Sequence, residues 1–137
     1  MLKDVKVVTL LDPTTTNGGA NSAYLDLTEA NEADIFVSLN QNVAHATVLT
    51  LQETAAATAN ANAKIWATED TSASEPDSED DGKSYTVDAD VAGKTVVFKV
   101  DPASLASGKT SVRVTASNSS QATNYISVIA VVKPRYS

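Results

Sequence analysis

The segment that decides the fold runs from Lys109 to Val132 and reads KTSVRVTASNSSQATNYISVIAVV. In its first half, Val112, Val114 and Ala116 alternate with polar residues, which predicts a strand buried on one face. Its last eight residues, 125–132, are apolar on both faces. One face carries Ile126, Val128, Ala130 and Val132, and the other carries Tyr125, Ile129 and Val131. A strand of that kind must be covered on both sides. We therefore expect it at the centre of a sandwich or against another chain.

Similar alternation recurs along the rest of the chain. The further runs span residues 23–27, 35–39, 48–51, 64–68, 85–89 and 96–100. Together, these about eight or nine short strands without a long helix predict an all-β fold, an antiparallel two-sheet sandwich that is jelly-roll-like. A turn of helix is expected after Asp101-Pro102. Because aromatic residues are only 5% of the chain, we expect a core of Val, Ile, Leu and Ala, with Phe36, Phe98 and Trp66 as the large fillers.

The length of 137 residues indicates one domain. Residues 1–22 contain a strand-like run followed by a Thr-, Asn- and Gly-rich connector. They form either an ordinary first strand with its loop, or an arm that pairs with a neighbouring subunit or partner. Residues 23–137 form the single β-sandwich domain.

The acidic residues are concentrated in one segment. The net charge is −7, and residues 69–81 hold seven of the 17 Asp and Glu residues but no Lys or Arg. Ten acidic residues remain elsewhere and balance the ten Lys and Arg. We expect an acidic, solvated loop over residues 69–83. Nucleic acid is not an expected partner, because no cluster of basic residues is present to neutralise phosphates.

The acidic loop carries a partial calcium-binding pattern. Asp77, Glu79 and Asp81 stand at alternate positions before Gly82, and Asp88 follows at the place of the last ligand. The pattern departs from a calcium loop in having Glu at the third position, Asp at the last and strands as flanks. We expect a solvated hairpin tip, with no metal and no cofactor.

Catalytic chemistry has little support in the sequence. His45 is the one histidine, and no Gly-x-Ser-x-Gly elbow accompanies it. The scattered carboxylates suggest no facing pair of the kind that glycoside hydrolysis requires. Cysteine is absent, so disulfides and Cys-based zinc sites are excluded. No apolar run approaches the ~20 residues of a membrane span. We expect a protein that is not an enzyme and does not enter a membrane.

The two ends of the chain are the candidate contact regions. The N-terminal strand offers Leu2, Lys3, Val5 and Val7. The C-terminal tail offers Lys133, Arg135 and Tyr136, and Pro134 ends the preceding strand because proline cannot donate to a ladder. Arg and Tyr are favoured in protein interfaces. The tail is either a frayed terminus or a docking element.

Four blocks of this sequence resemble the small jelly-roll capsid decoration proteins, or cement proteins, of tailed double-stranded DNA phages. They are KDVKVVTLLDPTTT (3–16), ADIFVSLNQNVAHATVLTLQETAAA (33–57) with AKI (63–65), GKTVVFKVDPASL (93–105), and SVRVTASNSSQATNYISVIAVVKPRY (111–136). The blocks cover most of the chain, and their order and the Pro-Arg-Tyr ending carry the resemblance. The acidic segment has no counterpart in that pattern.

The resemblance implies a role in the virion. Such a protein is made in the host cytoplasm and binds the outer surface of the assembled major capsid protein shell, as a homodimer or homotrimer. It has no catalytic residues to transfer. Two other classes remain open, namely another virion module of tail or fibre and a carbohydrate-binding β-sandwich. The latter would need a row of exposed aromatic side chains.

Overall fold

The described part of the chain is built from strands. The computed structural model describes residues 5–54, 59–68, 78–87 and 93–135, with the backbone alone for Ala59, Thr68 and residues 78–81. The strands are β1 (Lys6–Thr15), β2 (Ala20–Asn21), β3 (Leu25–Asp26), β4 (Ala30–Gln41), β5 (Thr47–Thr54), β6 (Ala59–Asn60), β7 (Ala63–Thr68), β8 (Ser78–Gly82), β9 (Ser84–Val87), β10 (Gly93–Val100), β11 (Ser111–Ala116) and β12 (Asn124–Pro134). A 3-10 turn, η1 (Pro102–Ser104), separates β10 from β11.

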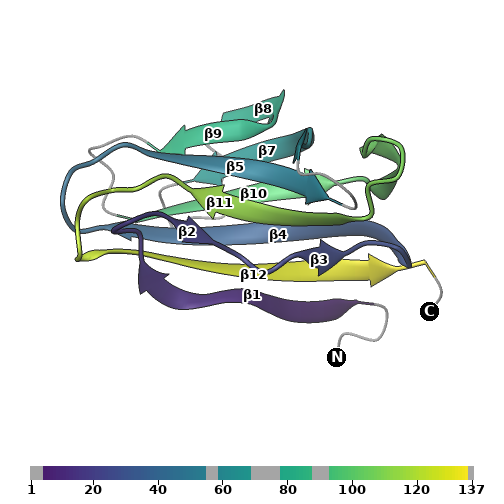
Figure 1. Cartoon of the computed structure of the whole chain (residues 1–137), viewed down its shortest axis with the longest axis horizontal. Coiled ribbons are helices and arrows are strands. Elements are labelled where there is room, and N and C mark those ends of the chain that lie inside the picture. Colours follow the sequence, from purple (N-terminus) through teal and green to yellow (C-terminus); the bar gives the residue numbers. More distant parts are fainter. Residues whose placement is uncertain (1–4, 55–58, 69–77, 88–92, 136–137) are drawn as a thin grey trace.

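The strands form two antiparallel sheets that pack face to face (Figure 1). Sheet A has the order β1-β12-β4-β10-β7-β8. Sheet B has the order β2-β11-β5-β6, with β3 also beside β11 and β9 also beside β5. From β1 to β5 and again from β9 to β12 the chain passes back and forth between the sheets, and the β7-β8 hairpin extends sheet A. This alternation is the winding of a jelly roll. It confirms the predicted fold class, although very short strands raise the number of segments above the prediction.

The core lies between the sheets and is aliphatic. Val112, Val114 and Ala116 point into it from sheet B, as predicted. Phe98 is fully buried, but Phe36 and Trp66 are half-buried on the outer face of sheet A, so their assignment to the core was wrong. The pleat explains the difference, because Ile35 and Val37 occupy the inward positions on either side of Phe36.

The last strand is buried on one face alone. Ile126, Val128, Ala130 and Val132 point into the core, as expected. On the opposite face, Tyr125 is 46% exposed and Ile129 is 41% exposed. β12 is flanked in its own sheet by β1 and β4, but no described segment covers its outer face. The first expected arrangement, a strand covered on both sides within the chain, is therefore not found.

The N-terminal strand pairs within its own chain. β1 lies antiparallel to β12, with Lys6 opposite Val132 and Thr15 opposite Tyr125. The register shifts twice, between Thr9 and Leu11 and between Leu11 and Thr14. Such bulges bend an edge strand and limit further pairing. Residues 6–15 therefore have the arrangement of an ordinary first strand, and the strand extends into the segment expected to be a connector.

The acidic loop expected over residues 69–83 ends earlier than predicted, because a strand occupies its C-terminal part. Residues 78–82 form β8, which pairs with β7 so that Asp81 lies opposite Lys64. Charged residues suit an edge strand, because they oppose pairing with further chains. Residues 69–77 lie outside the described part of the chain.

The start of β12 is fixed by the side chain of Asn124, which is buried. Its Oδ1 atom accepts a hydrogen bond from the Val43 N–H (2.8 Å), and its Nδ2 group donates to the Val43 carbonyl (2.9 Å). The loop between β4 and β5 is thus tied to β12. The start of β1 and the end of β12 lie at the other end of the sandwich (Figure 1).

Two isoleucines on β12 provide a matched test of which face of this strand is buried. Ile126→Ala is expected to reduce the free energy of unfolding by about 2–5 kcal/mol, because a fully packed side chain is replaced by a cavity. Ile129→Ala is expected to change it by about 0.5 kcal/mol or less, because that side chain is on the surface. Urea unfolding of both variants measures the difference. Equal losses would contradict the assigned faces of β12.

Candidate interaction surface

The described residues do not assemble a recognisable catalytic or metal centre. No group of three or more His, Cys, Asp or Glu side chains is close enough to hold a metal ion within the described ranges. The His45 ring nitrogen Nδ1 is buried and has no hydrogen-bond partner in this part of the structure. A Ser-His-Asp arrangement needs a carboxylate at that atom. Among the described residues, His45 therefore lacks the partner that such an arrangement requires.

The partial calcium pattern is not supported by the backbone. Glu79 and Asp81 lie on β8, which is extended and paired with β7. A calcium loop of the expected kind needs a tight turn at these positions. Asp77 and Asp88 lie outside the described residues.

A groove of about 720 Å³ lies at one end of sheet A, between β4, β7, β10 and η1. Its lining includes Glu32, Lys64, Lys99 and Asp101. The Lys99 Nζ atom lies 4.0 Å from the Glu32 Oε2 atom, and both side chains are well exposed. Asp101 caps η1 by accepting a hydrogen bond from the Ala103 N–H (3.0 Å), as the expected N-cap. The described lining residues include charged side chains and no aromatic one.

The outer face of sheet B is polar. Along β5 and β11 it presents Thr50, Gln52, Thr54, Ser111, Arg113 and Thr115. The Arg113 guanidinium donates to Gln52 Oε1 (3.0 Å) and lies 4.7 Å from the centre of the Tyr24 ring. Val48 is the large apolar residue on this face of β5, and it is 38% exposed. A face that pairs its polar groups with one another in this way suits contact with water.

The outer face of sheet A is different, because apolar side chains align across its strands. The registers place Ile129 (β12), Phe36 (β4), Val97 (β10) and Trp66 (β7) side by side in one line, which we call the apolar row. Ile129 is exposed and the other three are half-buried by one another and their neighbours. The row crosses four strands, which at ~4.8 Å between strands makes a band about 15 Å long. Contiguous apolar surface of this kind marks an interaction site.

A second line of residues, three of them charged, runs beside the apolar row, and we call it the charged line. In the same registers, Val131, Asp34, Lys99 and Lys64 lie next to one another across the same four strands. The Asp34 Oδ1 atom is buried and has no hydrogen-bond partner among the described residues. Burial raises the pKa of Asp34 above 3.8, while the nearby Lys99 opposes that shift and Glu32 adds to it. Asp34 is therefore a partly desolvated carboxylate on an otherwise accessible face.

The two predicted contact regions meet at one corner of sheet A. Because Lys6 pairs with Val132, the start of β1 lies beside the end of β12. The terminal corner, as we call it, comprises Val5, Lys6, Val7, Lys133 and Arg135. The Arg135 N–H donates to the Glu29 carbonyl (2.7 Å), which anchors the chain at this point. Leu2, Lys3 and Tyr136 lie outside the described residues.

The structure therefore brings together Val5, Val7, Lys133 and Arg135, four of the predicted contact residues. Val7 is 52% exposed and lies opposite Val131, next to the apolar row. The sequence did not predict the row itself. The outward position of Phe36 and Val97 could be read from the alternation, but their alignment with Ile129 depends on the strand registers.

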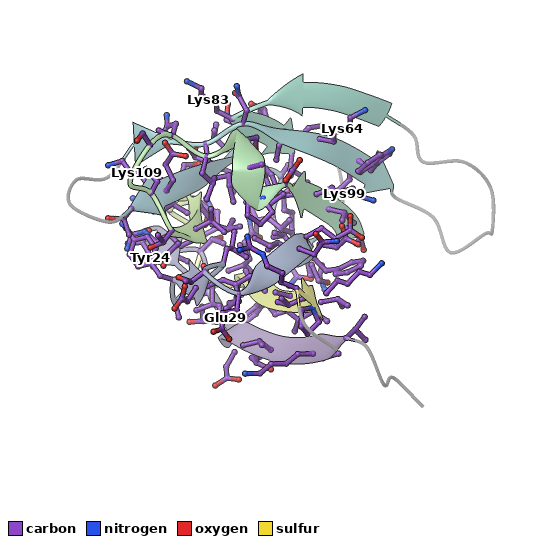
Figure 2. The ribbon with its side chains drawn as sticks, turned by 90° about the vertical axis from the view of Figure 1, so that its right-hand side faces the viewer. Tyr24, Glu29, Lys64, Lys83, Lys99 and Lys109 are labelled. Atoms are coloured by element: carbon purple, nitrogen blue, oxygen red, sulfur yellow. The ribbon has the colours of Figure 1, made fainter. Side chains whose placement is uncertain are left out.

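The end-on view separates the two outer faces (Figure 2). Lys64 and Lys99 of sheet A lie on one flank, and Tyr24 and Lys109 lie on the opposite flank. Lys83 lies at the top, far from β1 at the bottom. The tyrosines are not gathered on one face, since Tyr24 contacts Arg113 while Tyr125 belongs to sheet A. No helix in the described ranges is long and apolar enough to cross a membrane.

Comparison with known proteins identifies the fold and no family. No protein-family model matches the sequence, and no curated protein matches it. The solved structure of the SPBc2 prophage-derived protein YomS is similar, with a TM-score of 0.61, 10% identity, and coverage of 96% of this chain and 95% of that one. A CBM4 structure has a TM-score of 0.41 and 12% identity over 98% of this chain and 73% of that chain. The CBM22-2 xylan-binding domain of Paenibacillus barcinonensis Xyn10C has a TM-score of 0.38 and 9% identity over 97% of this chain and 93% of that chain. The first similarity establishes a shared fold over nearly the whole chain, and the other two are too distant to support an argument.

Asp34→Asn is expected to stabilise the separate chain at pH 7. Burial raises the pKa of Asp34 in the folded chain above 3.8. The folded chain therefore has its full stability below pH 3.8, where Asp34 is protonated, and loses part of it as the pH rises through the folded-state pKa and the carboxyl ionises. Asparagine is neutral at every pH. The advantage of the variant should therefore be small below pH 3.8 and grow toward neutral pH, in urea unfolding of dilute protein.

Asp26→Asn is the matched control with the opposite sign. Hydrogen bonds from the Thr28 hydroxyl (2.6 Å) and N–H (2.9 Å) lower the pKa of Asp26 below 3.8. Its stabilising effect is present above pH 3.8 and is lost as pH falls through the folded pKa. The Asn variant should therefore be less stable than the wild type at pH 7. The same sign for both variants would show that the two carboxylates are misassigned.

Proposed function

We propose that this protein is a phage head decoration protein, which binds the outer surface of the assembled major capsid protein shell and stabilises it. The observation that carries the proposal is the outer side of sheet A, where the apolar row continues through Val131 to Val7 at the terminal corner. The described residues offer a large area for protein contact and no assembled reaction centre. That combination suits a protein that acts by covering a surface.

The terminal corner is the proposed contact with the shell. Lys6, Lys133 and Arg135 are exposed there, beside the apolar side chain of Val7. These three basic residues lie next to acidic ones, since Lys6 shares a hollow with Asp26 and Glu29 and Lys133 lies opposite Glu32. Complementary charge guides the approach to a partner, and the apolar contact lowers the dissociation rate. Residues 1–4 and 136–137 adjoin this corner in the sequence, and we include them in the proposed contact.

The acidic segment 69–81 is proposed to face solvent. In sheet A, β8 is the strand farthest from β1, and it carries Glu79, Asp80 and Asp81. Negative charge on the outside keeps crowded particles in solution by mutual repulsion.

Binding of this kind stabilises the shell by mass action. A ligand that binds the assembled state and not the separate subunits shifts the equilibrium toward assembly. An oligomer that contacts two capsid subunits gains further from effective concentration. No chemical step is needed. The similar fold of a prophage-derived protein is consistent with a viral role, although it demonstrates the fold alone.

A carbohydrate-binding role is the second candidate. One observation favours it, since Phe36 and Trp66 lie in the same row on an open sheet face, where sugar rings can stack. A glycan array separates the two proposals. Binding that is lost on Trp66→Ala would favour the sugar role. Mass spectrometry of purified heads, separated from tails, distinguishes a head protein from a tail or fibre module.

A double variant, Lys133→Glu with Arg135→Glu, tests the shell contact. We expect the concentration for half-saturation of emptied heads to rise at least about tenfold, equivalent to ~1.4 kcal/mol, because two attractive contacts become repulsive. Co-sedimentation with emptied heads of the virus that encodes the protein measures it. Both side chains are exposed, so the fold should be retained.

Lys83→Glu is the control, because Lys83 is exposed and lies far from β1 (Figure 2). It should bind heads as the wild type does. Truncation must stop before β1, since Leu10 is buried in the core; removal of residues 1–4 should weaken binding and retain the fold. Full occupancy by both the double variant and the truncated protein would reject the terminal corner as the contact.

A further inference from the structure

The outer face of sheet A has the properties of a layer that lacks its neighbour. In its apolar row Ile129 is exposed and the other three side chains are half-buried, while the equivalent face of sheet B carries mainly polar side chains, among them the hydrogen-bonded pair of Arg113 and Gln52. Sheets pack face to face at about 10 Å, with their strands within about 30° of each other. A third sheet could therefore cover this face in the same way that sheet B covers the inner one.

We propose that two copies of this chain form a symmetric dimer by packing the outer faces of their A sheets together, about a two-fold axis that runs parallel to the strands between β4 and β10. In the second copy, such an axis reverses the order of the strands across the sheet. Each residue keeps its position along the strand direction. Residues of β4 then face residues of β10 in the other copy.

The apolar row is complementary to itself under this operation. Phe36 of one copy faces Val97 of the other, and Ile129 faces Trp66. Large side chains therefore meet smaller ones. Both pairs lie near the two-fold axis, where the angle between the strands of the two sheets moves facing residues apart least. Alternation of large and small residues across facing layers is what close packing requires.

The charged line is complementary to itself as well. The same axis places Asp34 of one copy opposite Lys99 of the other, and the pair occurs twice by symmetry. Within one chain, the Asp34 Oδ1 atom is buried and has no hydrogen-bond partner among the described residues. Burial already raises the pKa of Asp34 in the separate chain, which shows that the carboxylate gains from an added cation.

The size of the face suits a second copy. Six strands at ~4.8 Å between strands make the face about 24 Å wide, and β4, with 12 residues, sets its length at about 40 Å. A standard interface covers ~800 Å² on each partner, which is of the same order. Burial of the apolar row then offsets the entropy lost on association.

Association through the sheet edges is less favourable than association through the face. At one edge, β1 has two register shifts and carries Pro13, which cannot donate to a neighbouring strand. At the other edge, β8 has the sequence SEDDG, so two copies of it would bring like charges together. Both edges therefore oppose pairing, and the outer face of sheet A remains.

The dimer rests on the proposed function for its biological role, since it would supply the paired contacts that give avidity on a capsid. The contact itself concerns the protein alone, and its test uses no capsids. A dimer that does not bind heads would overturn the proposed function and leave the contact standing, and a monomer that binds heads would do the opposite.

Charge exchange between copies tests the contact directly. In sedimentation velocity over a concentration series, wild-type protein is expected to dimerise. Asp34→Lys and Lys99→Asp should each raise the dissociation constant at least about tenfold, because like charges then face each other. An equimolar mixture of the two variants should associate again as a heterodimer, since the two exchanged side chains then face each other with opposite charges. A change within one chain cannot produce that rescue.

Ile129→Glu tests the apolar row, with Val48→Glu as the matched control on the outer face of sheet B. The two side chains are similarly exposed, at 41% and 38%. Ile129→Glu should be monomeric and Val48→Glu dimeric, with unchanged circular dichroism in both. The proposal is overturned if the wild type is monomeric up to about 0.1 mM, above the range of specific interfaces. It is equally overturned if both Glu variants dimerise, if the mixture fails to associate, or if Ile129→Glu impairs only capsid or glycan binding of a monomer.

Discussion

The structure depends on the position of β12 between β1 and β4. Four apolar side chains of this strand enter the core from one face, and pairing on both edges holds the first and last strands of the chain together. The burial of Ile126 and Val128 fixes the register, because a shift of one residue would bring Tyr125 and Ile129 into the core. The open outer face of the strand is therefore a consequence of how its inner face is packed. The same pairing brings the two chain ends to one corner.

Local patterns predicted the sandwich but not its surfaces. The alternation of Val112, Val114 and Ala116, and of the residues of β12, was sufficient to assign inward and outward positions. The placement of Phe36 in the core was wrong because hydrophobicity was given more weight than the pleat at that residue. The apolar row could not be predicted, because it joins residues from four strands that are distant in sequence. Registers between such strands are set by the whole core and not by any one segment.

The two proposed contacts use different parts of one sheet. The apolar row lies toward its middle and is suited to a second copy of the chain, whereas the terminal corner lies at the β1 end and is suited to a larger lattice. The acidic strand β8 lies at the far edge. A sandwich whose two outer faces differ in this way can associate in a defined orientation, because the described outer face of sheet B is mainly polar, with Val48 as the large apolar residue on β5. This strand pairing brings together four of the predicted contact residues, Val5, Val7, Lys133 and Arg135. The sequence alone did not predict the pairing.

The most direct measurement is a reconstruction of the intact head of the virus that encodes this protein, at a resolution that separates β-strands. The account predicts pairs of sandwiches on the outside of the shell, joined through their A sheets, with the two terminal corners at the same end of the pair and toward the capsid protein. Absence of the protein from the shell, or sandwiches that lie against it through sheet B, would contradict the account.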